Sequence, residues 1–282
     1  MNRVIINADD FGIHTEVNRA VIEAHEQRLL LSTSLLASGP AFDEAAALAR
    51  QYPGLGVGIH LCLVGALPSV LSPKEVPTLV DDNGLLPESY VPLVKRMWTG
   101  RIDFEQVYRE LDAQMEKIMS AGLNVTHVDS HQHMHMLPPV WKIVQALMKK
   151  YDLHRLRIPK ESYSFKVMAA SPGRVMGRDG LTYLARKAMS DVKRLRFTTT
   201  DYFWGMVDGG HMTEANLAHI LRHMPFGVHE IMMHPGRSTA VLSQSFSWGY
   251  HWEEEFHALI SPRIRQLMKE QNIEPIHYGQ LP

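Results

Sequence analysis

Near the start of the chain, a short apolar run leads directly into two adjacent carboxylates and then into a helical pattern. Residues 4–6 are β-branched and predict a buried strand; Asp9 and Asp10 follow it, and Thr15 is the expected N-cap of a helix. In α/β proteins the carboxyl ends of parallel strands carry the ligands. Adjacent carboxylates there resist holding two bare charges, which favours a cation for one and a proton for the other. The competing interpretation is an Asp-rich turn that only caps the helix.

Strand and helix patterns alternate along most of the chain after this unit, which indicates an α/β fold of about seven or eight units. Two irregular stretches, at about 63–102 and 160–200, interrupt the rhythm and are expected to be insertions over the catalytic end. The further expected strands are 33–36, 56–61, 125–129, 156–159, 230–233 and 274–277, and the further expected helices are 42–51, 103–122, 139–150, 181–193, 213–221 and 253–269. We therefore predict one TIM-type (β/α) barrel domain over residues 1–282, regular or distorted, with an open doubly wound sheet as the alternative.

Composition excludes several classes of protein. With 45% apolar residues the chain can bury a large core, and 29 Lys and Arg against 30 Asp and Glu give no reason to expect a nucleic-acid partner. The single cysteine, Cys62, rules out an internal disulfide framework and fits a reducing compartment. The chain runs from Met1 directly into a strand without a signal-peptide pattern, and no apolar stretch approaches the roughly 18 residues of a membrane span. These features predict a cytoplasmic protein without a membrane span, and they leave a homodimer open.

Three more strand ends finish in side chains that can bind a metal or carry a proton. His60 ends the apolar strand 56–61, and His234 precedes a Pro-Gly turn. Taken alone, His60 is more often a core histidine and His234 a turn histidine, although His234 also suits a general acid. The segment 127–135 is more informative, because it holds four histidines and Asp129. Leaving so many imidazoles unpartnered in a core would be costly, so we expect a metal or substrate site there.

One carboxylate and two imidazoles form an open three-ligand site that leaves room for water or a substrate oxygen. A free carboxylate beside it could take the proton of the water, and a histidine opposite could protonate a leaving amine. This combination predicts metal-assisted hydrolysis of an amide or ester. No Gly-x-Ser-x-Gly, Walker A or Gly-x-Gly-x-x-Gly pattern occurs, so neither a serine nucleophile nor nucleotide chemistry is supported.

Four motifs together resemble the YdjC-like carbohydrate deacetylases. They are Asn-Ala-Asp-Asp-Phe-Gly at 7–12, Gly-Ile-His-Leu at 58–61, Thr-His-Val-Asp-Ser-His-Gln-His-Met-His at 126–135 and His-Pro-Gly at 234–236. The resemblance implies a (β/α)-barrel hydrolase, related to the chitooligosaccharide deacetylases, that removes N-acetyl groups from amino sugars. It also implies one divalent cation, with magnesium as the usual assignment and zinc, manganese, cobalt or nickel as alternatives.

Matching motif to motif gives each site residue an expected role. The resemblance implies Asp10, His60 and His131 as metal ligands, Asp9 as the general base and His234 as the acid. The remaining residues are expected to support these groups or to contact the substrate: His127 from the barrel interior, His133 or His135 near the substrate, Asp129, and Arg157, which would hold a substrate hydroxyl or steer a carboxylate.

A shorter stretch, residues 72–81, is similar to a branch of the family associated with hopanoid lipid biosynthesis, which implies a glycolipid substrate. Under that interpretation, apolar side chains of the insertions, such as Leu85, Leu86, Trp98 or Met168, should lie beside the pocket.

Two other functions compete with a deacetylase. The His131-Gln132-His133 pair also occurs in amidohydrolase and PHP-type phosphoesterase barrels, although those carry it at the first strand. A non-catalytic protein that binds sugar or metal ranks third, because binding alone needs no spare base beside the ligand.

Overall fold

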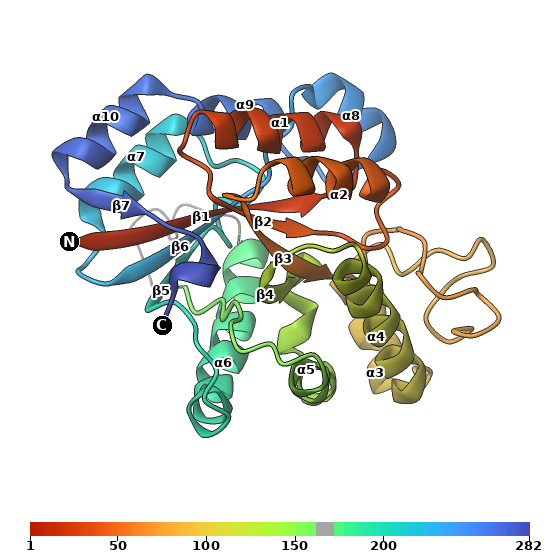
Figure 1. The fold of residues 1–282 in the computed structure, drawn as a ribbon. Helices are drawn as coiled ribbons and strands as arrows, with labels where there is room; N and C mark the ends of the chain where they lie inside the picture. Colours follow the sequence, from red (N-terminus) through yellow and green to blue (C-terminus); the bar gives the residue numbers. More distant parts are fainter. Residues whose placement is uncertain (162–171) are drawn as a thin grey trace.

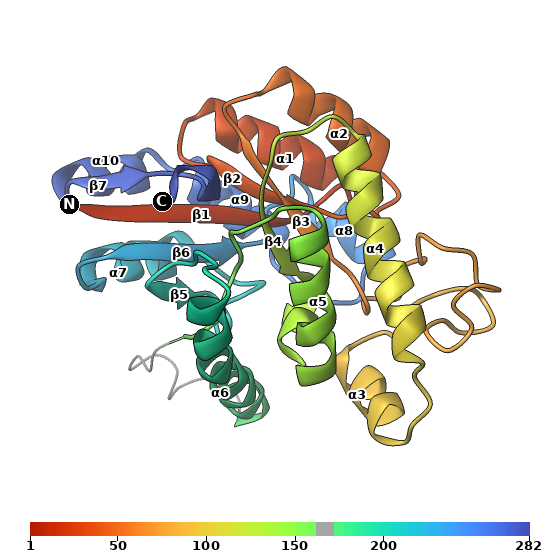
Figure 2. The same cartoon turned by 60° about the horizontal axis from the view of Figure 1, so that its bottom comes forward.

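A computed structural model describes residues 1–161 and 172–282, and within the helix at 172–194 it describes the side chains from 179 onward. Its strands are all parallel: β1 (Asn2–Phe11), β2 (Ser32–Leu35), β3 (Gly56–Leu61), β4 (Val125–Ser130), β5 (Tyr202–Trp204), β6 (Val228–Met233) and β7 (Ile273–Pro275). The strand order is β4-β3-β2-β1-β6-β5, and β7 also pairs with β1. One edge of β1 is shared, since its first residues pair with β7 and its last with β2. Figures 1 and 2 show β1 in the middle of the sheet, with both chain termini close together beside it.

Helices lie on two sides of the strands. Figure 1 shows α1, α2, α8, α9 and α10 above the sheet and α3 to α6 below it, and Figure 2 keeps α1 and α2 on the side opposite α4 to α6. The helices are α1 (Thr15–Glu26), α2 (Phe42–Gln51), α3 (Tyr90–Trp98), α4 (Phe104–Ser120), α5 (Pro138–Lys150), α6 (Pro172–Arg194), α7 (Glu214–His223), α8 (Thr239–Ser245), α9 (Trp252–Leu259) and α10 (Pro262–Glu270), with short 3-10 turns η1 (His131–Met136) and η3 (Tyr278–Gln280). No helix in the described part of the chain is long and apolar enough to cross a membrane.

The sheet curls into a half-barrel. Its regular strands do not close into a complete barrel, so the prediction of a regular TIM-type barrel is wrong. Between β4 and β5 the described residues form only isolated bridges, which join Val128 to Leu156, Arg155 to Thr198 and Glu161 to Phe203. The expected strand 156–159 is therefore not a continuous ladder. Proline 159 has no N–H to donate, so regular pairing cannot continue through it. A distorted version of the TIM-type fold describes the molecule.

Other local expectations also need correction. The helix expected over 253–269 is two helices, because Ser261 caps α10 by accepting from the Ile264 N–H and Pro262 begins it. The N-cap of α1 is His14, whose Nδ1 accepts from the Glu16 N–H, while Thr15 donates to Glu44. The insertions contain α3 and α6. Met168, which we expected beside the pocket, lies outside the described residues.

The two faces of the sheet differ in chemistry, and this difference positions the site. On β1, Val4, Ile6 and Ala8 belong to the main apolar core, whereas Ile5 packs with Tyr278 and the C-terminal residues in a smaller cluster. Because side chains alternate along a strand, the face that carries Ile5 also carries the next two odd-numbered residues, 7 and 9. That face therefore changes from apolar to polar toward the carboxyl ends of the strands.

Candidate active site

A chain of buried hydrogen bonds crosses the polar face of the sheet. Ser32 donates to Asn7 Oδ1 at 2.7 Å, and Asn7 Nδ2 donates to Asp9 Oδ1 at 2.8 Å and to Ser34 Oγ at 2.7 Å. Ser34 in turn donates to Asp129 Oδ2 at 2.6 Å. All five side chains are buried, so their polar groups need these partners. The network fixes Asp9 and Asp129, two of the predicted site residues, relative to one another.

A bulge at the end of β1 brings two neighbouring carboxylates to one place. Asp10 has a φ of 64°, and pairing with β2 shifts register between Ala8 and Phe11. Regular alternation would send adjacent side chains to opposite faces, and a bulge removes that constraint. The turn begins at Asp10 itself, and Gly12 follows with a φ of 94°. A non-glycine residue with this backbone conformation is typical of functional sites.

Asp10, His60 and His131 converge from the ends of β1 and β3 and from η1, which follows β4. Asp10 Oδ1 lies 2.9 Å from His131 Nδ1 and 3.3 Å from His60 Nε2. One donor atom of each residue lies within 4.8 Å of the others, and all three side chains are buried. Asp10 Oδ2, His60 Nε2 and His131 Nε2 have no hydrogen-bond partner, which is costly for buried polar atoms unless a cation satisfies them. The residues present therefore fit a divalent cation.

Asp129 prepares His60 for such a role. Asp129 Oδ1 accepts from His60 Nδ1 at 2.8 Å, which fixes the ring and leaves Nε2 directed at Asp10. Burial alone would lower the pKa of His60, but the charges of Asp129, Asp10 and Asp9 raise it to about 10. Burial would likewise raise the pKa of Asp10, but His131 and His60 hold it well below its usual value. Both shifts show that the cluster attracts positive charge.

Arg157 holds Asp9 with two parallel bonds. Its Nη1 and Nη2 donate to the two Asp9 oxygens at 2.6 and 2.7 Å, Nη2 lies 3.0 Å from Asp129 Oδ2, and Nε donates to Glu230 at 2.8 Å. This guanidinium is fully buried, and burial would lower its pKa, but Asp129, Asp9 and Glu230 raise the pKa well above its usual value. Arg157 therefore fixes the position of the Asp9 carboxylate, and the expectation that it steers a catalytic carboxylate stays a prediction.

A second buried group of possible ligands, formed by Asp9, His60 and Asp129, overlaps the first. Arg157 already supplies a cation to both of its carboxylates, so a metal ion there would meet an adjacent positive charge. The cluster of Asp10, His60 and His131 makes no ion pair with Arg157, and it is the better place for a cation.

His127 and His135 support the structure and do not line the cavity. His127 stacks on Tyr278 with ring centres 4.0 Å apart, and a Cβ on Gly58 would lie 2.2 Å from its ring. Burial lowers the pKa of His127 to about 3. The His135 N–H donates to Ser130, and Nε2 donates to the Arg157 carbonyl at 3.0 Å. Burial lowers the pKa of His135 to about 4, so both rings are neutral near pH 7.

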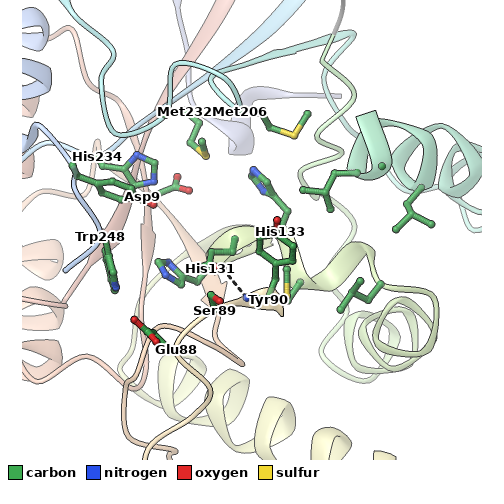
Figure 3. Close-up of a pocket in the computed structure, with 18 of the residues that line it drawn as sticks. Asp9, Glu88, Ser89, Tyr90, His131, His133, Met206, Met232, His234 and Trp248 are labelled. Carbon is green, nitrogen blue, oxygen red and sulfur yellow. Dashed lines mark hydrogen bonds between the residues drawn. The ribbon is translucent and has the colours of Figure 1, made fainter. Parts of the chain in front are cut away.

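The cavity of about 840 Å³ opens beside the cluster and contains Asp9, His131, His133 and His234 on its polar side (Figure 3). His133, in the left-handed region with a φ of 58°, contacts Phe203 edge-on, and its Nδ1 has no hydrogen-bond partner. The size suits a small ligand or part of a larger one. Of the three residues of the cluster only His131 is among those that line the cavity.

Glu255 holds the cavity wall at His234. The His234 backbone N–H donates to Glu255 Oε2, and His234 Nδ1 lies 3.9 Å from the same oxygen. Glu255 also accepts from the Met212 N–H at 2.9 Å. Burial raises the pKa of Glu255, although His234 opposes the rise. The His234 ring is therefore placed beside a buried acid.

The other walls of the cavity are largely apolar and come in part from both insertions. They are formed by Tyr90, Met134, Leu137, Leu181, Leu184, Met206, Met232, Trp248 and Tyr250, together with the polar Glu88, Ser89 and Gln132. The Tyr90 N–H donates to Gln132 Oε1, which ties the first insertion to η1 (Figure 3). Three of the residues that we expected beside the pocket do not line it, namely Leu85, Leu86 and Trp98. Leu181 and Leu184 of α6 line it instead.

Sequence reasoning missed Glu230, Glu255 and Tyr278. Glu230 accepts from Arg157 and from the Tyr278 hydroxyl at 2.5 Å, and burial raises its pKa to about 7. An acidic residue inside the apolar run 228–233 was the available signal for Glu230. Glu255 had no such signal, because the acidic run 253–255 is typical of a solvated first helical turn.

Comparison with known proteins places these features in a family. The sequence profile described as YdjC-like protein matches residues 3–270. A carbohydrate deacetylase of Brevibacillus brevis is 30% identical over 281 residues, 99% of both chains. A carbohydrate deacetylase of Geobacillus stearothermophilus is 32% identical over 275 residues, 97% of this chain and 96% of the relative.

A solved structure has the same fold. It is a protein of Enterococcus faecalis, provisionally described as a cellobiose-phosphate cleavage protein, with a TM-score of 0.77 and 28% identity, and the similarity covers 99% of this chain and 98% of that one. Taken with the profile match, this agrees with the resemblance of the four motifs, and the chain belongs to the YdjC-like family.

Proposed function

We propose that the protein is a metal-dependent carbohydrate deacetylase that removes the N-acetyl group from an acetylated amino sugar. The observation that carries the proposal is the buried cluster of Asp10, His60 and His131, of which His131 lines the cavity together with Asp9 and His234. The curated relatives named carbohydrate deacetylase, which match nearly the whole chain, support the same reaction.

Asp10, His60 and His131 would hold the cation. The set of one carboxylate and two imidazoles suits zinc, manganese, cobalt or nickel, and magnesium as well where water completes its shell. A bound divalent cation supplies Lewis acidity, which polarises the acetyl carbonyl and lowers the pKa of water. Asp129 would keep His60 in the orientation that presents Nε2.

Asp9 and His234 would carry the proton transfers. Asp9 accepts a proton from the attacking water, and His234 donates one to the leaving nitrogen, so that the amide and water become acetate and a free amine. Arg157 holds both Asp9 oxygens in place and Asn7 also donates to Oδ1, yet Oδ2 accepts only the bond from Arg157, which would leave that oxygen able to accept a proton. The neighbouring Glu255 would stabilise a positive charge on the His234 ring.

Acetate release tests the proposal directly. A panel of N-acetylated sugars, oligosaccharides and glycolipids is incubated with the enzyme, with and without a chelator, and acetate is measured. We expect release from at least one amino sugar and its loss on chelation. The same enzyme should leave p-nitrophenyl phosphate intact. Release of p-nitrophenol without any acetate would instead assign a phosphoesterase, and glycan binding without turnover would assign a binding protein.

The apolar walls favour a substrate with an apolar group beside the sugar. Leu181 and Leu184 of α6 line the cavity, whereas their neighbour Tyr183 is 61% exposed and does not. We predict that Leu184→Ser lowers kcat/KM for an N-acetylglucosaminyl glycolipid at least about tenfold, since burying a leucine against an apolar ligand stabilises binding by about 1.5–3 kcal/mol. Turnover of N-acetylchitooligosaccharides should change much less.

Tyr183→Ser is the matched control, because it alters the same helix outside the cavity. Equal losses on both substrates in Leu184→Ser, or an equal loss on the glycolipid in Tyr183→Ser, would remove the support for an apolar subsite.

A further inference from the structure

Three metal-competent side chains also meet on the protein surface, apart from the buried cluster. His211, from the segment between β5 and α7, places its Nε2 3.0 Å from Glu254 Oε2, and His251 places its Nδ1 3.3 Å from Glu254 Oε1. The two imidazole rings have centres 4.2 Å apart. One donor atom of each residue lies within 4.8 Å of the others, so a single ion can contact all three.

The backbone holds the residues of this cluster at fixed relative positions. The His251 N–H donates to the Gly210 carbonyl at 2.7 Å, which joins the start of α9 to the segment that carries His211. The His211 N–H donates to the Asp208 carbonyl at 2.8 Å. His251 is the N-cap of α9, but its ring makes no capping bond to the backbone, and Nδ1 faces Glu254 within the cluster. Little chain ordering is therefore required to complete the site.

We propose that His211, His251 and Glu254 form a second metal site, which binds a divalent transition metal of the zinc class. Two imidazoles and one carboxylate are a donor set that zinc accepts, and the half-exposed position leaves a fourth place for water. Both imidazoles face the same carboxylate, so one cation could contact all three side chains at once.

The site lies beside the substrate cavity, and this position gives it a consequence. Gly209 and Tyr250, which precede Gly210 and His251 in the chain, both line the cavity. A metal ion would therefore join two parts of the cavity wall, the segment 205–212 and the start of α9. We expect zinc to slow amide hydrogen exchange in segment 205–212. The proposal needs only these surface residues and does not rest on the proposed function.

Counting zinc equivalents tests the proposal. Chelator-treated protein without a polyhistidine tag is titrated with zinc by equilibrium dialysis, and its cobalt form is followed by visible absorption. We expect His211→Ala, and independently Glu254→Gln, to bind one equivalent fewer than the wild type. Asp10→Asn should keep the surface equivalent, and His211→Ala combined with Asp10→Asn should bind neither. His257→Ala, an exposed histidine one turn along α9, should match the wild type.

Several outcomes would overturn the proposal. They are an unchanged number of equivalents in His211→Ala, an equal loss in His257→Ala, or zinc that leaves hydrogen exchange in segment 205–212 unaltered. Unfolding is not an alternative explanation where His211→Ala keeps the wild-type circular dichroism and Tm in chelator. If the buried cluster fails to bind zinc, the wild type should bind one equivalent at the surface site and His211→Ala should bind none. The proposed surface site can therefore be tested whether or not the buried cluster binds zinc.

Discussion

Asp9 and Asp10 are neighbours in the chain but have different partners. Asp9 is held by Arg157 and Asn7 and reaches the cavity, whereas Asp10 faces His60 and His131 and keeps one oxygen without a partner. We predict that Asp9→Asn keeps the metal but loses about 100-fold or more in turnover, the range for a general base. Asp10→Asn should lose metal affinity, and excess metal should restore part of its rate.

Metal titration of both variants, with acetate release as the readout, separates the two roles. If excess metal restores Asp9→Asn but leaves Asp10→Asn inactive, the roles of base and ligand must be exchanged. Wild-type protein in the same metal series provides the control for inhibition by excess metal.

Glu230 gives the buried network a pH dependence. Burial raises the pKa of Glu230 to about 7, although Arg157 and Tyr278 oppose the rise, and the usual value is 4.5. The folded protein therefore binds a proton more tightly than the unfolded chain. This contribution to stability is fully present below pH 4.5 and is lost as the pH rises through about 7. From the two pKa values its size is about 3 kcal/mol.

Glu230→Gln should remove that contribution. We predict that the stability difference, wild type minus Glu230→Gln, falls by about 3 kcal/mol between pH 4.5 and pH 8, as measured by denaturant unfolding of the metal-free proteins. Taking the difference cancels the other titrating groups that the two proteins share. A difference that is constant with pH, or that rises with it, would show that Glu230 is ionised throughout.

At the scale of single residues, sequence reasoning singled out the groups at strand ends, together with Asp129 and Arg157, and missed Glu230, Glu255 and Tyr278. Asp10, His60 and His131 stand out because each interrupts or ends an apolar pattern. The bond from Arg157 to Asp9 spans 148 positions in the chain, and that from Tyr278 to Glu230 spans 48. No local pattern records contacts of this range, so only the fold reveals which residue positions which.

At the scale of elements, β3 and β4 approach closely because glycine stands opposite a histidine. A Cβ on Gly58 would lie 2.2 Å from the His127 ring, which Tyr278 covers on another side. We predict that Gly58→Ala destabilises the protein by about 1–3 kcal/mol or more, the usual cost of overpacking. The same substitution should cost much less in a His127→Ala background, because the truncated side chain removes the clash.

A double-mutant cycle by thermal or denaturant unfolding measures this coupling. Gly180→Ala, in a helix and with no atom within 4 Å of the added Cβ, is the control and should be neutral or stabilising. Additive costs of Gly58→Ala and His127→Ala would contradict the predicted contact. Because we assign His127 a supporting role, His127→Ala should also keep the bound metal.

The elements that the sequence predicted well are those with long periodic patterns. Helices over 103–122 and 139–150 have clear apolar stripes, and α4 and α5 lie there. β5 was missed, since its three residues, Tyr202 to Trp204, directly follow a stretch with no clear pattern. The break between α9 and α10 was also missed, although Ser261-Pro262 is an N-terminal helix signal, because apolar periodicity continues across it.

At the scale of the whole molecule, the sequence could not predict whether the sheet closes into a barrel. A strand pattern at 156–159 predicts a strand but not whether a ladder forms on each edge, and the described residues there make only isolated bridges. Closure depends on the partners available to both edges, which a local pattern does not contain. We propose that residues 1–282 nevertheless form one domain, because the C-terminal β7 pairs with the N-terminal β1.

The same connections should make metal binding a global effect on stability. Asp10, His60 and His131 come from three separate parts of the chain, and unfolding would disperse them. On the polar face Arg157 pairs with Asp9, Asp129 and Glu230 but not with Asp10, so a divalent cation would give Asp10 a positive partner. A ligand that binds only the folded state at 100 times its Kd stabilises by about 2.7 kcal/mol.

For a chain of this size, 2.7 kcal/mol corresponds to a rise in Tm of about 5–10 °C. We predict that rise on adding manganese or zinc to chelator-treated protein, measured by calorimetry in a His211→Ala background so that the surface site does not contribute. Asp9→Asn in the same background should show a rise of similar size, because it keeps all three proposed ligands. Asp10→Asn should show little. An equal rise in Tm in Asp10→Asn would mean that the cation binds elsewhere. We also expect a single unfolding transition in every trace, because the half-barrel should unfold as one unit.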